Sequence, residues 1–199
     1  MNWSEAVVAP YVTLMPVLVA GIGNMAWVKA PVAKWLARPI DGGHELADGR
    51  PVLGRNKTWK GLVGMVVLGA ALAVAWGGVL AGSPGLASQN RFYDSFANHP
   101  AVNLALGAAM GLVYAIFELP NSFIKRRLGV TPGHSAPGPA RLVLIVLDQA
   151  DSVIGLVLLA VIVTPLPWSV GLVWIVVGSA THLALNVLLY LAHLRRSPV

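Results

Sequence analysis

Three of the chain's eight Asp and Glu residues lie in or at the ends of apolar segments: Glu118, Asp148 and Asp151. A carboxylate at membrane depth costs about 3 kcal/mol on insertion scales, so such groups usually face a polar cavity and serve a function. The spacing in LDQADS places Asp148 and Asp151 on one face of a helix. Because their charges repel, they need a positive partner, either a divalent cation with oxygen ligands or a pair of arginines.

Glu118 opens the stretch ELPNSFIKRR, in which an acid, a hydroxyl and a base follow one another. Helical spacing from Glu118 to Ser122 and on to Lys125 would align them. Proline disfavours a helix interior, so Pro120 predicts a helix break beside Glu118. Three interpretations of the acids stay open: metal or phosphate chemistry, structural ion pairing with the basic run Lys125–Arg127, and a proton or ion pathway.

A second basic stretch, GRPVLGRNKTWKG, spans Gly49–Gly61. Gly49 and Gly54 have the separation of a Walker A loop, but the Lys57-Thr58 pair comes two positions late and no strand precedes it. The sequence therefore excludes a P-loop NTPase. It leaves a glycine-punctuated basic loop that leads into an apolar segment, where a helix amino terminus and lysines would bind phosphate. The alternative is a solvated basic border of a membrane protein.

The elements that must position these residues are membrane helices. The chain of 199 residues is 56% hydrophobic and only 11% charged, which indicates an integral membrane protein. It has no cysteine, which excludes disulfides and thiolate metal sites. We expect an all-α, polytopic protein, one membrane-embedded domain over residues 1–199, with a plain connector near Ser83–Pro100. Five segments are long enough to span a bilayer: Ala6–Val28, Leu62–Leu80, Ala101–Leu119, Leu142–Val163 and Trp168–Leu191.

The charges of the loops predict how the protein is oriented in the membrane, and the small residues of the spans predict how its helices pack. Every Lys and Arg except Arg91 lies in the segment between the first and second spans, in that between the third and fourth, or in the tail. The positive-inside rule then places the N-terminus outside and the C-terminus and both basic loops in the cytoplasm, in a multi-pass protein of the plasma membrane. The net charge of +6 suits anionic lipid headgroups, and we expect no nucleic-acid partner. Glycines in the spans suit close helix packing: Gly61, Gly64, Gly69, Gly107, Gly111, Gly171 and Gly178.

Four pieces of the sequence together resemble the CDP-archaeol synthase family, within the wider group of membrane cytidylyltransferases that includes CDP-diacylglycerol synthase. They are Pro39–Asp41, Asp48–Gly61, Ser122–Gly129 and Leu147–Asp151, and the order of LG..KTW, SFIKRR and LDQ.D is specific. The resemblance covers nearly the whole chain. The chain departs from the family pattern at Phe117-Glu118, where the family typically has Gly-Asp.

The resemblance implies an enzyme that transfers CMP from CTP to a lipid phosphate, either an archaeol phosphate-like lipid or phosphatidic acid, with Mg²⁺ and release of pyrophosphate. It implies Mg²⁺ ligands at Asp148 and Asp151, with Glu118 as the third. It also implies catalytic roles for Lys125, Arg126, Asp148 and Asp151. The substrate-binding residues would be Lys57, Thr58, Lys60, Asn121, Ser122, Arg127, His182 and Asn186.

Two rival classes remain at this point. A small transporter or channel would need polar groups that continue to the outer face, whereas the outer halves of the spans are almost wholly apolar. A lipid-binding membrane protein without turnover would carry the same acids as structural ion pairs. His182 and Asn186, four residues apart in the last span, also fit hydrogen bonds between helices.

Overall fold

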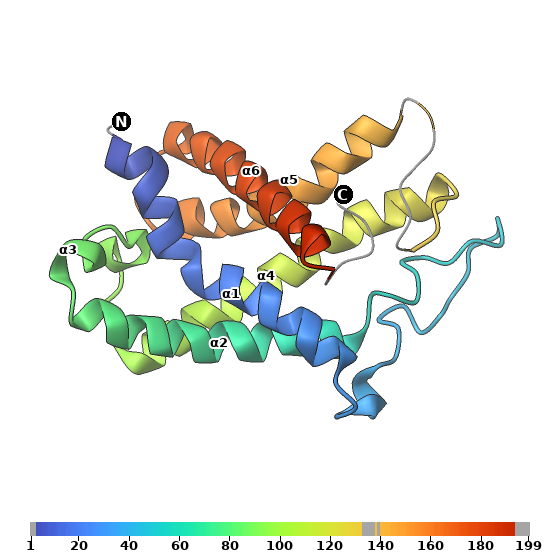
Figure 1. Cartoon of the computed structure of the whole chain (residues 1–199), viewed down its shortest axis with the longest axis horizontal. Helices are drawn as coiled ribbons and strands as arrows, with labels where there is room; N and C mark the ends of the chain where they lie inside the picture. Colours follow the sequence, from blue (N-terminus) through green and yellow to red (C-terminus); the bar gives the residue numbers. More distant parts are fainter. Residues whose placement is uncertain (1–2, 133–137, 139, 194–199) are drawn as a thin grey trace.

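Five long helices make up most of the protein in the computed structural model, which describes residues 3–132, 138 and 140–193 (Figure 1). Their ranges confirm the five expected spans, and the chain is an all-α, multi-pass membrane protein. Short helical segments join them. In chain order the elements are η1 (Ser4–Val8), α1 (Ala9–Lys29), η2 (Lys34–Leu36), α2 (Trp59–Ala81), α3 (Pro84–Ala87), η3 (Arg91–Asp94), α4 (Pro100–Arg127), α5 (Ala140–Val163) and α6 (Trp168–Leu191).

The closest helix pair, α2 and α4, packs through glycines. A Cβ added at Gly69 would lie 2.5 Å from the carbonyl oxygen of Gly107, and one added at Gly111 would lie 2.1 Å from that of Met65. Only glycine allows backbones to approach this closely in lipid. The packing prediction is therefore confirmed at this crossing, which fixes α4 against α2.

Helix α4 continues through Pro120 to Arg127, so the predicted break beside Glu118 is wrong. Proline removes one backbone donor, but packing of α4 against α2 on one side and α5 on the other holds the helix in place. A helix of 28 residues is about 42 Å long, which exceeds the roughly 30 Å of a bilayer core. Its last turns, which carry Glu118 to Arg127, thus reach the membrane border in regular helical register.

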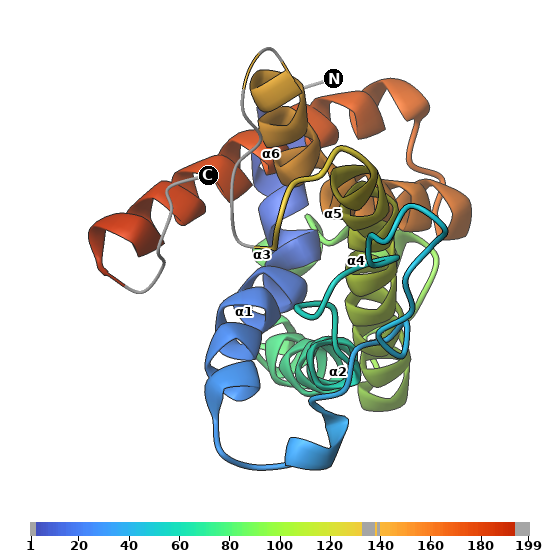
Figure 2. The same cartoon turned by 90° about the vertical axis from the view of Figure 1, so that its right-hand side faces the viewer.

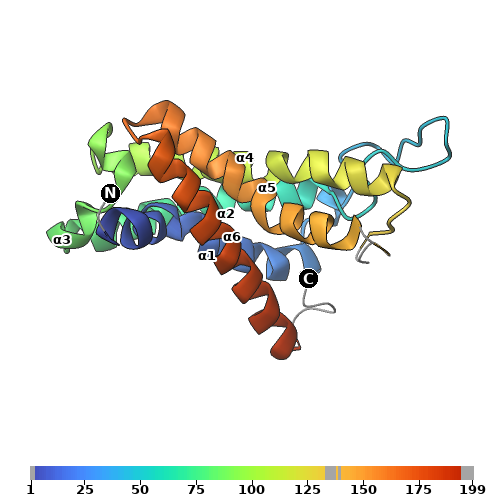
Figure 3. The same cartoon turned by 90° about the horizontal axis from the view of Figure 1, so that it is seen from above.

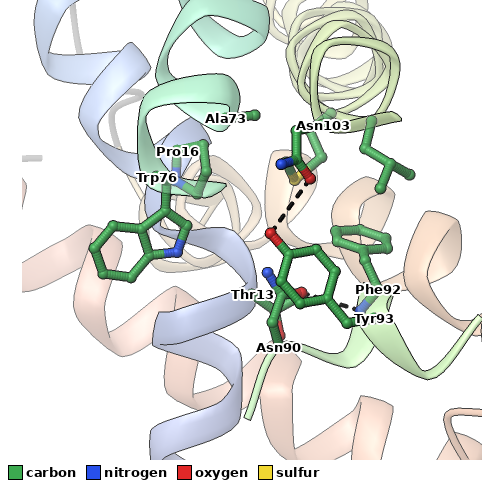
Figure 4. A pocket seen from close by; sticks show the side chains of 10 residues that line it. Thr13, Pro16, Ala73, Trp76, Asn90, Phe92, Tyr93 and Asn103 are labelled. Atoms are coloured by element: carbon green, nitrogen blue, oxygen red, sulfur yellow. Dashed lines mark hydrogen bonds between the residues drawn. The ribbon is translucent and has the colours of Figure 1, made fainter. Parts of the chain in front are cut away.

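The segment between α2 and α4 is more ordered than the plain connector we expected. It folds into α3 and η3, and Phe92 is buried against the core. Thr13 of α1 accepts a hydrogen bond from the amide of Arg91, and the hydroxyl of Tyr93 lies 3.3 Å from Asn103 of α4 (Figure 4). Polar side chains that no sequence motif marked therefore close this end of the bundle.

The opposite end carries the basic loops. Segment 30–58 leaves α1, extends beyond the helices and returns to α2, and Figure 2 shows it crossing in front of the ends of α2 and α4. Helix α6 contacts α5 and η1 and crosses the other helices obliquely, with most of its surface exposed (Figure 3). The basic tail residues Arg195 and Arg196, and most of the Pro/Gly loop between α4 and α5, lie outside the described residues.

Candidate active site

The two aspartates of α5 meet on one amide of α4. Nδ2 of Asn121 donates to Oδ1 of Asp148 at 2.6 Å and to Oδ2 of Asp151 at 2.9 Å. Asn121 is buried, and its Oδ1 has no hydrogen-bond partner. The shared helix face predicted for the aspartates is thus aimed at α4, and Asn121 links the two carboxylates directly.

Lysines cover the acids from two directions. Lys125, one turn after Asn121 on α4, forms an ion pair with Asp148. Lys57, in the loop before α2, forms an ion pair with Glu118 of α4. All four side chains are partly buried, and the charges of Glu118 and Lys57 act on the neighbouring Asp151. Acids and bases from three elements are therefore gathered in one polar cluster at the loop end of the bundle.

The expected metal ligands are only partly assembled. Within residues 3–132, 138 and 140–193, no group of three His, Asp or Glu side chains forms a metal site, and Glu118 is paired with Lys57. The donor set nevertheless fits a hard cation, because rotation of the Asn121 amide would turn its unpartnered Oδ1, in place of the donating Nδ2, toward the two aspartate carboxylates. The structure thus offers Asn121, expected as a substrate ligand, as the third oxygen.

Arg126 is a catalytic candidate whose guanidinium is buried, and no acid among the described residues forms an ion pair with it. The residue is 5% exposed, and its Nε and Nη1 are buried without a hydrogen-bond partner. Its Nη1 lies against Gly54, where an added Cβ would come within 3.1 Å. Gly54 has a φ of +98°, which favours glycine, so the loop reaches the guanidinium because this position has no side chain. Such a buried cation with free donors is suited to an anion.

A cavity of about 140 Å³ opens next to this cluster, between α1, the start of α2 and α4. Its polar lining includes Asn24, Asn56, Lys57 and Glu118, while Leu62 is among the apolar residues that line it. The volume suits a fragment such as a headgroup or a base rather than a whole nucleotide. The Lys57–Glu118 pair therefore borders both this cavity and the aspartates.

Two predicted substrate ligands have structural contacts. Nζ of Lys60 donates to the carbonyl oxygens of Val28 and Ala30 at the end of α1 and lies over the ring of Trp27, and Lys60 is 2% exposed. Thr58 caps the start of α2, where its hydroxyl accepts from the amide of Gly61. We therefore remove Lys60 from the proposed substrate contacts and keep Thr58, because Thr58 also lines the cavity beside Lys57.

The polar pair of α6 contacts α5. Nδ2 of Asn186 donates to Oε1 of buried Gln149 at 2.7 Å, and Nδ1 of His182 lies 3.4 Å from the Gln149 carbonyl oxygen. These contacts favour the interhelical interpretation over substrate binding. Ser122 is partly buried on α4, directly after Asn121. Gln149 had no functional signal in the sequence beyond its place between the two aspartates.

Asp41 organises the basic loop that begins at Gly49 and leads into α2, which we call the glycine loop. The sequence reasoning missed this role of Asp41. Its Oδ2 accepts from the amides of Leu53 and Gly54, and its Oδ1 accepts from Gly43. Partial burial alone would raise the pKa of Asp41, but these backbone amides outweigh it and hold the pKa below its ordinary value. The Asp-Gly-Gly sequence, typical of a side-chain-capped turn, was the available signal.

Comparisons with known proteins give the family and the fold of the chain. A family model described as CarS-like CDP-archaeol synthase matches residues 14–198. The chain belongs to the CDP-archaeol synthase family. It is 31% identical to the CDP-archaeol synthase of Aeropyrum pernix, over all of this chain and 96% of that one. It is 34% identical to that of Pyrococcus furiosus, over 81% of this chain and 83% of that one.

A solved structure described as an intramembrane enzyme for archaeal membrane lipid biosynthesis has the same fold, with a TM-score of 0.59 at 25% identity over 89% of this chain and 92% of that one. Family membership makes the chain a CTP-dependent lipid cytidylyltransferase of the membrane, a class of nucleotidyltransferase that typically uses a divalent metal. The transporter and non-catalytic alternatives are not favoured.

Proposed function

We propose that the chain transfers the cytidylyl group of CTP to archaeol phosphate, giving CDP-archaeol and pyrophosphate. The relatives from Aeropyrum pernix and Pyrococcus furiosus are named for the product CDP-archaeol, which favours the ether lipid over phosphatidic acid. The observation that carries the proposal is Arg126, a buried guanidinium with unpartnered donors that lies against Gly54 of the glycine loop. A triphosphate supplies the anionic oxygens that this cation lacks.

In the proposed reaction, an oxygen of the lipid phosphate attacks the α-phosphorus of CTP. The bond from the α-phosphorus to the bridging oxygen breaks, and pyrophosphate leaves with that oxygen. The lipid phosphate is already ionised at pH 7, so the step needs no general base. It needs alignment of the two phosphates and neutralisation of their charge.

The basic side chains would supply that neutralisation. Arg126 and Lys125 lie one residue apart at the end of α4 and would bind the leaving pyrophosphate. Lys57 would hold the incoming lipid phosphate, since it borders the cavity that opens between α1, α2 and α4. Both lysines now pair with carboxylates, Lys125 with Asp148 and Lys57 with Glu118. Phosphate binding would therefore exchange one anion for another at each lysine.

Mg²⁺ is the divalent metal that we propose. It would be held by Asp148, Asp151 and the carbonyl oxygen of Asn121, and it would neutralise phosphate charge when bound. Glu118 is the alternative third ligand. The side chain of Glu118 is longer than that of the aspartate typical of the family, and its carboxylate forms an ion pair with Lys57.

The whole chain would act as one membrane domain. The positive-inside rule supports a plasma-membrane orientation with the basic loops and this cluster facing the cytoplasm, where CTP is available. Ser122 stays a candidate phosphate contact from its place beside Asn121 on α4.

The deciding experiment measures pyrophosphate release by the purified protein in detergent with Mg²⁺, CTP and either archaeol phosphate or phosphatidic acid. We expect release that requires archaeol phosphate and that is lost in Asp151→Asn. Asp94→Asn, which removes an exposed carboxylate of η3 at the opposite end of the bundle, is the matched control and keeps full activity. Equal release with both lipids would overturn the lipid assignment, and no release with either would overturn the reaction.

A further inference from the structure

The glycine loop is fastened to the end of α4 by a reciprocal contact of two arginines. Nη1 of Arg127 lies 2.7 Å from both carboxylate oxygens of Asp48, and Nη2 donates to the carbonyl oxygens of Arg50 and Pro51. In return, Nη1 of Arg50 donates to the carbonyl oxygen of Arg127. The guanidinium also lies 5.3 Å from the centre of the Phe123 ring. We name the contacts of Arg127 with Asp48, Arg50 and Pro51 the loop clamp.

These contacts occupy both terminal nitrogens of Arg127 and leave only its buried Nε without a partner. A phosphate could reach those nitrogens only by displacing Asp48 or the two carbonyl oxygens. Neighbouring Arg126 contacts a different part of the loop, since its Nη1 would lie 3.1 Å from a Cβ added at Gly54. The two adjacent arginines thus differ in their contacts. Arg126 has donors left to bind an anion, whereas Arg127 binds the loop with both of its terminal nitrogens.

The clamp holds the part of the loop that lies farthest from its closed base. The base of the loop is already closed, since the amide of Ile40 donates to the carbonyl oxygen of Lys57, and that of Trp59 donates to Arg38. Asp41 fixes Leu53 and Gly54 from within. Those contacts lie inside segment 38–59, whereas the clamp, within the part of the chain that the structure describes, ties residues 48–51 to the end of α4.

The consequence reaches the proposed active site. Gly54 and Lys57 follow directly after the clamped residues in the chain, and they contact Arg126 and Glu118, respectively. A loop that swung away from α4 would withdraw Gly54 from the guanidinium of Arg126, whereas Lys57, at the closed base of the loop, would keep its place beside Glu118. The clamp therefore sets the distance between the two phosphate-binding elements, the loop and the end of α4.

We propose that Arg127 is a positioning residue that, with Asp48, holds the glycine loop against α4 so that the loop and α4 bind CTP together. This assignment replaces direct substrate binding by Arg127. The proposal rests on the proposed function where it is tested by KM for CTP. Its second test, the hydrogen exchange of the loop amides, is independent of that function.

A double-mutant cycle separates positioning from substrate contact. We expect Asp48→Asn and Arg127→Gln each to raise KM for CTP about tenfold, the change expected when charge-assisted hydrogen bonds are exchanged for water. The double variant should be no worse than Arg127→Gln, because both changes break one clamp. Asp94→Asn, which breaks an exposed pair with Arg91, is the control with unchanged KM. An Asp48→Asn variant with normal or lowered KM would overturn the proposal, since a phosphate-binding Arg127 gains from the loss of a competing carboxylate.

The absence of cysteine from the chain allows a rescue experiment. We expect the single variants Asp48→Cys and Arg127→Cys to have raised KM and faster amide hydrogen exchange over residues 44–54. Joining both cysteines of the double variant with a short bifunctional maleimide should restore slow exchange and a near-normal KM. A neutral link cannot replace a phosphate contact, so slow exchange without recovery of KM would overturn the positioning role. Unaltered exchange in both single variants would overturn the clamp itself, whatever the enzymatic result.

Discussion

Replacement of Arg126 by methionine should stabilise the protein while it damages catalysis. The buried guanidinium has two nitrogens without partners, and each unmade hydrogen bond of a buried donor costs about 1–3 kcal/mol. A flexible apolar side chain of similar length removes this cost and the cost of the buried charge, and such replacements have stabilised other proteins by about 1–4 kcal/mol. Allowing for relaxation around the methionine, we expect a gain of about 2 kcal/mol, or roughly 4–8 °C in Tm for a chain of this size.

The same change should weaken nucleotide binding. Hydrogen bonds to charged groups contribute about 1.5–3 kcal/mol each, and 1.4 kcal/mol corresponds to tenfold in affinity. Loss of the Arg126 guanidinium should therefore raise the Kd for CTP at least tenfold. The stabilisation of the protein by a fixed CTP concentration should fall accordingly.

The assay is thermal unfolding of the detergent-solubilised protein with and without CTP and Mg²⁺. Arg38→Met removes the same charge from an exposed position on the basic side. It should change the free energy of unfolding by less than about 0.5 kcal/mol, so both Tm values should stay within about 2 °C of wild type. If Arg126→Met lowered Tm without nucleotide and kept the shift caused by CTP, Arg126 would be a structural residue and the reasoning would be refuted.

Three further predictions concern the loop and the helix crossing. Gly54→Ala should lower CTP affinity more than Gly43→Ala does, because both have positive φ but only the first would push a methyl group toward the buried guanidinium; isothermal titration with CTP checks this. Gly111→Ala should lower Tm by several degrees, since its methyl group would meet the backbone of α2 at 2.1 Å, whereas Gly78→Ala should change Tm little because nothing lies within 4 Å; thermal unfolding of the two variants compares them. Asp41 should order the loop above pH 4 and lose this effect as pH falls through its lowered pKa. The protection of the loop amides, measured as their exchange rate relative to an unstructured peptide at the same pH, should therefore fall in acid in wild type and vary less with pH in Asp41→Asn.

Each of these predictions has a clear contrary result. Equal effects of the two loop glycines would mean that backbone strain alone matters at Gly54. Equal Tm values for Gly111→Ala and Gly78→Ala would contradict the close crossing of α2 and α4. A pH dependence that persists in Asp41→Asn would assign the titration to another group.

Much of the site could be predicted from residue types and spacing. The pair Asp148 and Asp151 stood out because carboxylates in apolar segments are costly, and their spacing placed them on one helix face. The pairing of Asp148 with a lysine was among the stated alternatives, and the structure shows Lys125 in that role. The sequence could not show that Asn121 joins the two carboxylates, since that contact depends on how α4 packs against α5.

The sequence placed Lys60 and Arg127 among the substrate-binding residues, because composition cannot tell a cation that binds substrate from one held by contacts within the protein. Lys60 and Arg127 carry the same charge as Lys57 and Arg126 and belong to the same motifs. In the structure, Lys60 binds carbonyl oxygens at the end of α1, and Arg127 clamps the glycine loop. Which basic residue stays free for phosphate depends on which acceptors the fold brings within reach.

The sequence by itself determined that this is a five-span helical membrane protein with its chemistry at one end, because apolar length, loop charge and the rarity of buried acids act locally along the chain. The tertiary structure decided how the charges are paired. Hydrogen bonds and ion pairs act over only about 3 Å. Helix crossings and loop closure, to which residues distant in sequence contribute, therefore fix that Arg127 pairs with Asp48 while Arg126 keeps two donors without partners.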